Sequence, residues 1–217
     1  MKYYIDTEFI EGFNKPIFGK NRHFIDLISI AIVGEDGSEF EAISSEYNYN
    51  DADEWVKENV IIPLYLKTVH GDNRNIFSSE NFHKHYGMSN KKIKAEILKY
   101  IWRDAWSAWM DSSDEFFDRG IKYGWCSENP EFYAYFADYD WVLFCSLFGR
   151  MIDLPAQFPM YCIDLKQTLD EKQYIFGNQE LNDIKKLPLY PKQRNEHSAL
   201  DDAKWNMELH KFLLVLD

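Results

Sequence analysis

Two carboxylates lie close together near the start of the sequence. Asp6 and Glu8 close an apolar, strand-favouring segment that runs from Tyr3 to Phe9. Side chains at positions i and i+2 of a strand point to the same face, so the pattern predicts two acids side by side. Two neighbouring anions repel each other, and a divalent cation that prefers oxygen ligands, Mg²⁺ or Mn²⁺, relieves that repulsion. The alternative is an ordinary acidic surface pair, because 36 of the 217 residues are Asp or Glu.

A third acid follows a predicted strand in the middle of the chain. Residues 131–136 are apolar enough for a buried strand, and a helix is predicted over 141–148. Asp140 therefore stands at a strand-to-helix junction, the edge of an open α/β sheet where ligand sites gather. Asp138 is the competing candidate for this role. Asp140 could also be a helix N-cap without any further function.

The last helix supplies a fourth acid and a histidine. Ser198 with Asp201 three positions on resembles a capping box, which predicts a helix from Ser198 to about Leu216. Residues five apart on a helix differ by roughly 140° in direction, so His197 and Asp202 cannot share a site from mid-helix. We therefore expect His197 in the loop before the helix and Asp202 in its first or second turn. An imidazole titrates at about 6.5, which suits a general base; the alternative is an exposed loop histidine.

The elements around these residues predict an α/β fold, a sheet flanked by helices. Three strands open the chain, and helices and strands then alternate. A loop is expected over 10–23 and a turn at 34–37, and Pro63 should end or kink the first helix. The predicted strands cover 3–9, 24–33, 39–44, 131–136 and 159–164, and the predicted helices cover 51–66, 89–108, 141–148, 165–173 and 198–216.

The composition is that of a folded chain. Hydrophobic residues make up 46% and aromatic residues 17% of the sequence, which favours a single domain over 1–217 with insertions near 67–88 and 109–129. The sequence has no apolar run of membrane-spanning length and no signal-like N-terminus, so we expect a cytoplasmic protein without a membrane segment. Three widely spaced cysteines predict buried thiols. The formal net charge of −12 predicts weak non-specific binding to nucleic acid.

Taken together, the motifs resemble a known group of enzymes. Asp6-Thr7-Glu8, Tyr139-Asp140 after a strand, and His197 with Asp202 are similar to the three motifs of the DEDDh 3′-5′ exonucleases. More closely, the segments 4–11, 27–30, 34–37 and 197–200 resemble the bacterial polyadenylate-specific exoribonuclease family. Two departures are visible: Phe136 stands where many members carry Asn, and the segments 67–88 and 109–129 look like additions.

This resemblance implies a ribonuclease H-like (DnaQ-like exonuclease) fold with a mixed five-stranded sheet. It implies a metal-dependent 3′-5′ exoribonuclease that releases nucleoside 5′-monophosphates from single-stranded RNA 3′ ends, with a preference for adenylate. It also implies a homodimer and two Mg²⁺ or Mn²⁺ ions about 3.5–4 Å apart. The implied metal ligands are Asp6, Glu8, Asp140 and Asp202, the implied general base is His197, and Thr7 and Phe9 are the candidate substrate-binding residues.

The sequence indicates the residues that contact substrate less specifically than it indicates the metal ligands. Phe9 could stack on the terminal base, although a place in the core is the commoner fate of Phe. Basic residues of the 185–194 loop could steer phosphates. Trimming of DNA 3′ ends on the same site is a second function, and a nucleic-acid or protein-binding module without catalysis is a third. The presence of all four acids and the histidine argues against the third.

Overall fold

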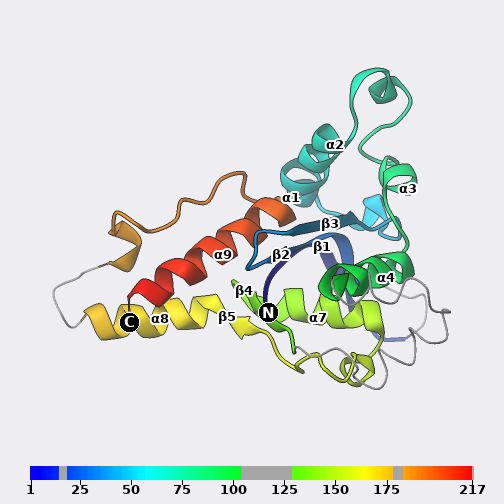
Figure 1. The fold of residues 1–217 in the computed structure, drawn as a ribbon. Helices are drawn as coiled ribbons and strands as arrows, with labels where there is room; N and C mark the ends of the chain where they lie inside the picture. Colours follow the sequence, from blue (N-terminus) through cyan, green and yellow to red (C-terminus); the bar gives the residue numbers. More distant parts are fainter. Residues whose placement is uncertain (15–18, 104–128, 178–182, 217) are drawn as a thin grey trace.

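A five-stranded mixed sheet forms the centre of the computed structural model (Figure 1). The structure describes residues 1–14, 19–103, 129–177 and 183–216. The strands are β1 (Lys2–Asn14), β2 (Arg22–Gly34), β3 (Glu39–Ile43), β4 (Glu131–Ala134) and β5 (Ile163–Asp164). Their order is β3-β2-β1-β4-β5, so β1 lies in the middle. It pairs antiparallel with β2 and parallel with β4.

Two pairs of helices cover the two faces of the sheet (Figure 1). Alternate strand residues point to opposite faces, so Ile5 packs on one side of β1 and Tyr4 on the other. The predicted α/β sheet flanked by helices is confirmed, and the arrangement is compatible with a ribonuclease H-like fold. The helices on the Ile5 side are α4 (Asn90–Ile101) and α7 (Ala137–Phe148), and those on the Tyr4 side are α8 (Leu165–Gly177) and α9 (Ala199–Val215).

A helical segment after β3 packs against the far part of the β1–β2 pair. Ile10 and Ile28 from these strands belong to the same buried cluster as Val60, Ile61 and Phe82 from the helical segment. The segment 67–88, predicted as an insertion, contains two short helical turns that belong to this layer. The elements are η1 (Tyr49–Asp51), α1 (Glu54–Val56), η2 (Lys57–Ile61), α2 (Ile62–Thr68), η3 (Gly71–Asn75) and α3 (His83–Tyr86).

The helix predicted over 51–66 is present as α1, η2 and α2, and Pro63, which was expected to end or kink it, does not end it. The helix begins after Asp53, whose side chain accepts a hydrogen bond from the Val56 N–H at 2.8 Å. η2 is a π-helical stretch, and Pro63 then occupies the first turn of α2, where a missing N–H is tolerated. The helical path therefore continues to Thr68.

The predicted loop over 10–23 is wrong, because β1 and β2 extend as a long antiparallel pair. The pairing continues to Asn14, opposite Arg22. Gly12 lies inside this pair, and a Cβ at that position would meet the Phe24 ring at 2.8 Å. The glycine therefore admits an aromatic ring close to the backbone and does not break the strand.

The strand-to-helix junctions also differ from the prediction. α7 begins at Ala137, four residues earlier than expected, so Asp138 and Asp140 lie in its first turn and Asp140 is not its N-cap. β5 has two residues where a strand over 159–164 was expected. α8 runs on to Gly177. Short 3₁₀ turns, η4 (Met151–Asp153) and η5 (Ile184–Lys186), lie in the connections.

α9 begins where the sequence predicted, but its first turn lacks the predicted capping hydrogen bond from the Ser198 side chain. Ser198 is the N-cap, and its carbonyl oxygen accepts the Asp202 N–H at 2.9 Å. Within the described residues the Ser198 side chain makes no capping hydrogen bond, so the predicted capping box is wrong. The Asp201 carboxylate instead accepts a hydrogen bond from Asn195 at 3.3 Å.

The middle of the chain tests two predictions only in part. Of the two residues that could cap the helix predicted over 89–108, Ser89 or Asn90, Ser89 is the cap of α4, because its side chain accepts a hydrogen bond from the Lys92 N–H at 3.3 Å. α4 ends at Ile101, with Trp102 as its C-cap, so it is shorter than predicted. Almost all of the insertion expected over 109–129 lies outside the described residues.

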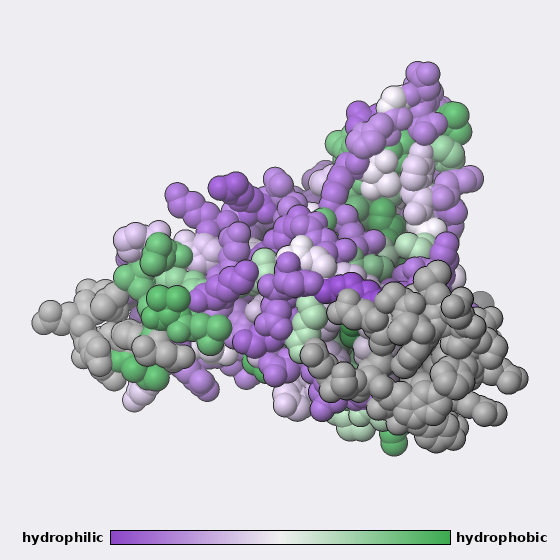
Figure 2. Space-filling view, in the orientation of Figure 1, coloured by the Kyte–Doolittle hydropathy of each residue, from purple (hydrophilic) through white to green (hydrophobic). Residues whose placement is uncertain are grey.

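The face of the molecule drawn in Figure 2 is largely hydrophilic. Hydrophobic residues gather on it near the end where α8 and the C-terminal half of α9 lie. None of the helices that the structure describes is long and apolar enough to cross a lipid bilayer.

Phe132 on β4 provides a test of the first core layer. It is 1% exposed, and its ring packs against Trp141, Phe144 and Phe158. Phe132→Ala should lower the free energy of unfolding by about 3–5 kcal/mol, because it leaves a cavity in this aromatic layer. Urea denaturation measures the change. Ile152→Ala, at a side chain 69% exposed, should cost less than about 0.5 kcal/mol, and an equally small loss for Phe132→Ala would contradict the packing described.

Candidate active site

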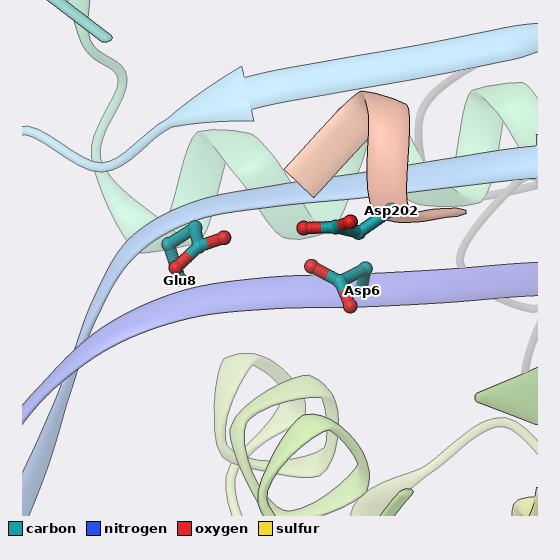
Figure 3. Close-up of side chains that lie close together, drawn as sticks. All are labelled: Asp6, Glu8 and Asp202. Carbon is teal, nitrogen blue, oxygen red and sulfur yellow. The ribbon is translucent and has the colours of Figure 1, made fainter. Parts of the chain in front are cut away.

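The central strand carries Asp6 and Glu8 on the face that α9 covers. Both follow Tyr4 at steps of two residues, and Tyr4 packs on the α9 side. Beside Glu8 the pairing of β1 with β2 shifts, which leaves Ile28 as an extra residue in β2. A bulge of this kind bends and twists the strands next to it, and Figure 3 shows β1 curving at this point. The bend therefore lies where the site is built.

α9 brings Asp202 to the same place. Ala203 is fully buried and small, so the helix can lie close to the sheet. Asn206, one turn beyond Asp202, donates from Nδ2 to the Ile5 carbonyl oxygen at 3.0 Å and ties α9 to β1. The buried residues of the helix recur at steps of three and four, which is one helical face.

Asp6, Glu8 and Asp202 form a compact group of carboxylates (Figure 3). One carboxylate oxygen from each residue lies within 4.8 Å of the other two. Asp6 and Glu8 are half-buried and Asp202 is buried. Three of the four predicted metal ligands therefore meet, although their positions in the sequence are almost two hundred residues apart.

Asp140 reaches the same cavity from the opposite face of the sheet. Thr7, between the two acids of β1, points toward α7, where its backbone N–H and its Oγ1 donate to Oδ1 of Asp140 at 2.8 and 2.6 Å. Asp140 is buried, whereas the alternative ligand Asp138 is exposed. Asp140 thus lines the cavity without belonging to the compact group of three. The Thr7 hydroxyl, predicted to contact substrate, is engaged with Asp140.

The four carboxyl groups have raised pKa values, and burial is the largest cause in each case. Burial and the carboxylates of its neighbours, Asp140 first, raise the pKa of Asp6 well above its usual range. The same effects raise the pKa of Glu8 to about 8. Burial raises the pKa of Asp140 to about 7 although the hydrogen bonds from Thr7 act in the other direction. The pKa of Asp202 is also raised by burial. The cluster is therefore short of positive charge.

The cavity over these acids has a volume of about 250 Å³. Its lining, as far as the structure describes it, contains four carboxylates and neither lysine nor arginine. Hard divalent cations take sets of carboxylate oxygens, so this donor set fits Mg²⁺ or Mn²⁺. The cavity is lined by Asp6, Thr7, Glu8, Phe9, Tyr135, Phe136, Tyr139, Asp140, Gln193, His197, Asp202, Trp205 and Asn206.

His197 lies in the loop before α9, as predicted. Its backbone has a φ of 68°, in the left-handed region, and its N–H donates to Oδ2 of Asp202 at 2.9 Å. Its ring lies edge-on to Trp55, with 4.8 Å between the ring centroids. His197 and Glu8 also border two adjoining cavities, of about 360 and 540 Å³. The imidazole is therefore placed at the point where three hollows meet.

Two residues at the site were missed in the sequence. Gln193 donates from Nε2 to Oδ1 of Asp202 at 2.6 Å, so both oxygens of Asp202 accept a hydrogen bond from the loop. Gln193 lies in an irregular segment, where no periodicity marks it. Asn206 could have been found, because a polar residue four positions after Asp202 shares its helical face.

Of the other residues predicted to contact substrate, some lie near the cavity and others lie at the far end of the 185–194 loop. Phe9 is half-buried at the cavity, with its ring centroid 5.2 Å from that of Tyr139. Lys192 and Arg194 are exposed on either side of Gln193, next to the site. At the other end of the loop, the Nζ of Lys186 lies 3.6 Å from Oδ2 of Asp183 and forms an ion pair with it.

Two curated proteins are similar to this chain over almost its whole length. The proteins named 3′-5′ exoribonuclease Rv2179c and 3′-5′ exoribonuclease MT2234.1 come from two strains of Mycobacterium tuberculosis. Each is 26% identical over 215 residues, which cover 99% of this chain and 93% of the relative. No family model matches the chain. The similarity therefore spans the segments that carry all four acids and the histidine.

The raised pKa values predict an unusual pH dependence for the metal-free protein. Native Asp6, Glu8 and Asp140 hold protons that the unfolded chain, with carboxyl pKa values near 4, has released. The native state binds more protons, so the free energy of unfolding rises as pH falls through this range. In EDTA, the melting temperature should rise by on the order of 5 °C between about pH 8.5 and 7, above the range in which an ordinary histidine titrates.

Glu8→Gln is the control for this experiment, because it removes a group with a pKa of about 8 and should flatten the rise. Saturating Mg²⁺ should also flatten or reverse it, since a cation binds the ionised carboxylates. A metal-free melting temperature that stays constant or falls as the pH is lowered would contradict the described electrostatics.

Thr7 should matter through its hydroxyl group. Thr7→Val keeps the shape of the side chain and removes one of the two hydrogen bonds to Asp140, so the free energy of unfolding near pH 8 should fall by about 1.5–3 kcal/mol. Thr7→Ser keeps the hydroxyl and should lose less than half of that. Chemical denaturation of both variants in EDTA makes the comparison, and equal losses would show that the hydroxyl does not hold Asp140.

Proposed function

We propose that this protein is a 3′-5′ exoribonuclease that releases nucleoside 5′-monophosphates from the 3′ end of single-stranded RNA. The observation that carries the proposal is the cavity in which carboxylates from β1, α7 and α9 meet beside His197. Similarity to two named exoribonucleases over 99% of the chain supports the same class of reaction. The absence of Lys and Arg from the described lining favours a site that takes its positive charge from cations.

In this proposal Asp6, Glu8, Asp140 and Asp202 hold two Mg²⁺ or Mn²⁺ ions. Four carboxylates carry about the charge that two divalent cations bring. When bound, such cations supply a nucleophile at neutral pH and neutralise the charge that develops on the transferred phosphoryl group. The chain itself orients the ligands: Thr7 fixes Asp140 through two hydrogen bonds.

His197 is the proposed general base, which accepts the proton of the attacking water. Its position in a loop gives the ring room to reach a water above the carboxylates. The loop is tied to the site because Asp202 accepts both the His197 N–H and the Gln193 side chain. Asp202 is thus proposed to bind a cation and to position the loop of the base at the same time.

Substrate binding is proposed to use the rim of the cavity. Arg194 and Lys192, exposed beside Gln193, suit the phosphates of the incoming strand, and Phe9 suits the terminal base. The resemblance adds an adenylate preference and a homodimer to the proposal. A single domain over 1–217 with the two insertions, and a location in the cytoplasm, complete it.

The proposal is tested on a 5′-labelled single-stranded RNA, with Mn²⁺ binding measured by calorimetry. The wild type should shorten the RNA one nucleotide at a time, only with Mg²⁺ or Mn²⁺ present. Asp140→Asn should lower the rate by at least about a hundredfold, because it removes a charged ligand of the cations that act on the reacting phosphate, whereas Asp138→Asn, its exposed neighbour, should stay within about twofold. His197→Ala should lower turnover by about 10²–10⁴-fold and keep Mn²⁺ binding, and Asp6→Ala should lose both.

Each other outcome has a definite meaning. If Asp138→Asn lost activity while Asp140→Asn retained it, Asp138 and not Asp140 would be the third metal ligand. Unchanged Mn²⁺ binding in Asp6→Ala would remove Asp6 from the ligand set. Faster shortening of a DNA of the same sequence would favour the DNA 3′-exonuclease, and nucleic-acid binding without any cleavage would favour a module that has lost catalysis.

A further inference from the structure

Phe136 combines three features that disfavour a large apolar residue. Its φ of 58° lies in the left-handed region, which a side chain with a Cβ rarely adopts. Its side chain is 62% exposed. It lines the cavity that contains the four carboxylates. Strained backbone of this kind persists where the surrounding structure holds it, and it gathers at ligand sites.

The surrounding structure does hold Phe136, through Asp164 at the end of β5. Oδ1 of Asp164 accepts the Phe136 N–H at 3.3 Å and the Lys166 N–H at 2.7 Å. One carboxylate therefore fixes the turn from β4 into α7 and the turn from β5 into α8. Both turns lie at the carboxyl edge of the parallel strands, where α/β sheets bind ligands.

An aromatic wall with a cation beside it results from this arrangement. The Lys166 Nζ lies 5.8 Å from the centroid of the Phe136 ring. Tyr135 supports the ring from the edge, at 4.8 Å between centroids, and Trp205 in turn lies 5.0 Å from Tyr135. Phe136, Tyr135 and Trp205 line the same cavity as the four carboxylates. The Phe136 ring therefore lies beside the place where a phosphodiester would react.

The Lys166 ammonium keeps its place on this wall because it also pairs with Asp170, one turn further along α8. A ring with open surface and an adjacent ammonium is the combination that binds single-stranded nucleic acid, because a base stacks on the ring and the next phosphate meets the cation. Core packing does not account for Phe136, since most of its side chain faces solvent.

We propose that Phe136 is a stacking platform for a nucleobase of the substrate strand, with Lys166 placed for the adjoining phosphate. The inference rests on the nuclease function proposed above and adds to it a residue that grips the strand. Every base has a face that can stack, so this platform selects unpaired strands and not a particular base.

The test measures binding without turnover. The dissociation constant of a 5′-fluorescein-labelled RNA octamer is measured by anisotropy in EDTA. Phe136→Asn, which removes the ring and tolerates left-handed backbone, should weaken binding about tenfold, the loss of one stacked base. Phe136→Tyr keeps a ring and should stay within about twofold. Tyr174→Asn removes another exposed aromatic ring, 77% exposed on α8 eight residues beyond Lys166, and should also stay within about twofold.

A cycle with modified RNA separates stacking from a structural effect. Abasic sites are placed singly at the last three positions of the octamer. One of them should weaken binding to the wild type about tenfold and leave binding to Phe136→Asn unchanged, because the interaction is already missing. Phe136→Asn should melt at or above the wild-type temperature, since the left-handed backbone suits Asn better.

The results that overturn the platform are distinct from those that overturn the nuclease. Binding by Phe136→Asn within twofold of the wild type, an abasic penalty equal in both proteins, or no binding of the octamer by the wild type would each overturn it. Failure of the wild type to cleave RNA with Mn²⁺, while the tenfold effect and the cycle hold, would overturn the nuclease and leave the platform standing.

Discussion

Repulsion among four buried or half-buried carboxylates is the constraint on which the site depends. Burial raises the pKa of all four groups, and repulsion from neighbouring carboxylates adds to it for Asp6, Glu8 and Asp140, with Glu8 at about 8 and Asp140 at about 7. The described lining supplies no lysine or arginine to offset this charge. Hydrogen-bond donors compensate only in part, and the raised pKa values show that the acids favour protons over ionisation when no cation is bound. In the function proposed above, cations take the place of these protons, and their binding stabilises the native state.

The central place of β1 makes the cluster possible. Alternate residues of the strand face opposite sides of the sheet, so Asp6 and Glu8 meet Asp202 of α9 (Figure 3). Thr7, which faces the other side, meets Asp140 of α7. Two helices on different faces thus deliver carboxylates to one strand. The bulge in β2 lies beside Glu8, one of the residues that line the cavity, and a bulge of this kind bends the strands next to it.

Local patterns in the sequence predicted part of this arrangement. The shared face of Asp6 and Glu8 follows from strand periodicity, and the place of His197 before α9 follows from helical geometry. The hydrogen bonds from Thr7 to Asp140 join residues 133 positions apart, so no local sequence pattern could predict them. Phe136 was expected to continue a strand, because its apolar character hides a left-handed backbone that only Gly or Asn would have signalled. Gly12 favoured a loop in the sequence, but it lies within β1, where the absence of a side chain leaves room for the Phe24 ring.

The cavity proposed as the active site combines four carboxylates, which would hold cations, with the exposed Phe136 ring, which would stack on a base of the strand. We propose that divalent ions bind between β1, α7 and α9. Crystals soaked in Mn²⁺, measured at a wavelength where manganese scatters anomalously, test this most directly. Anomalous peaks are expected within bonding distance of the side chains of Asp6, Glu8, Asp140 and Asp202. Peaks found only elsewhere, or none in this cavity at saturating Mn²⁺, would contradict it.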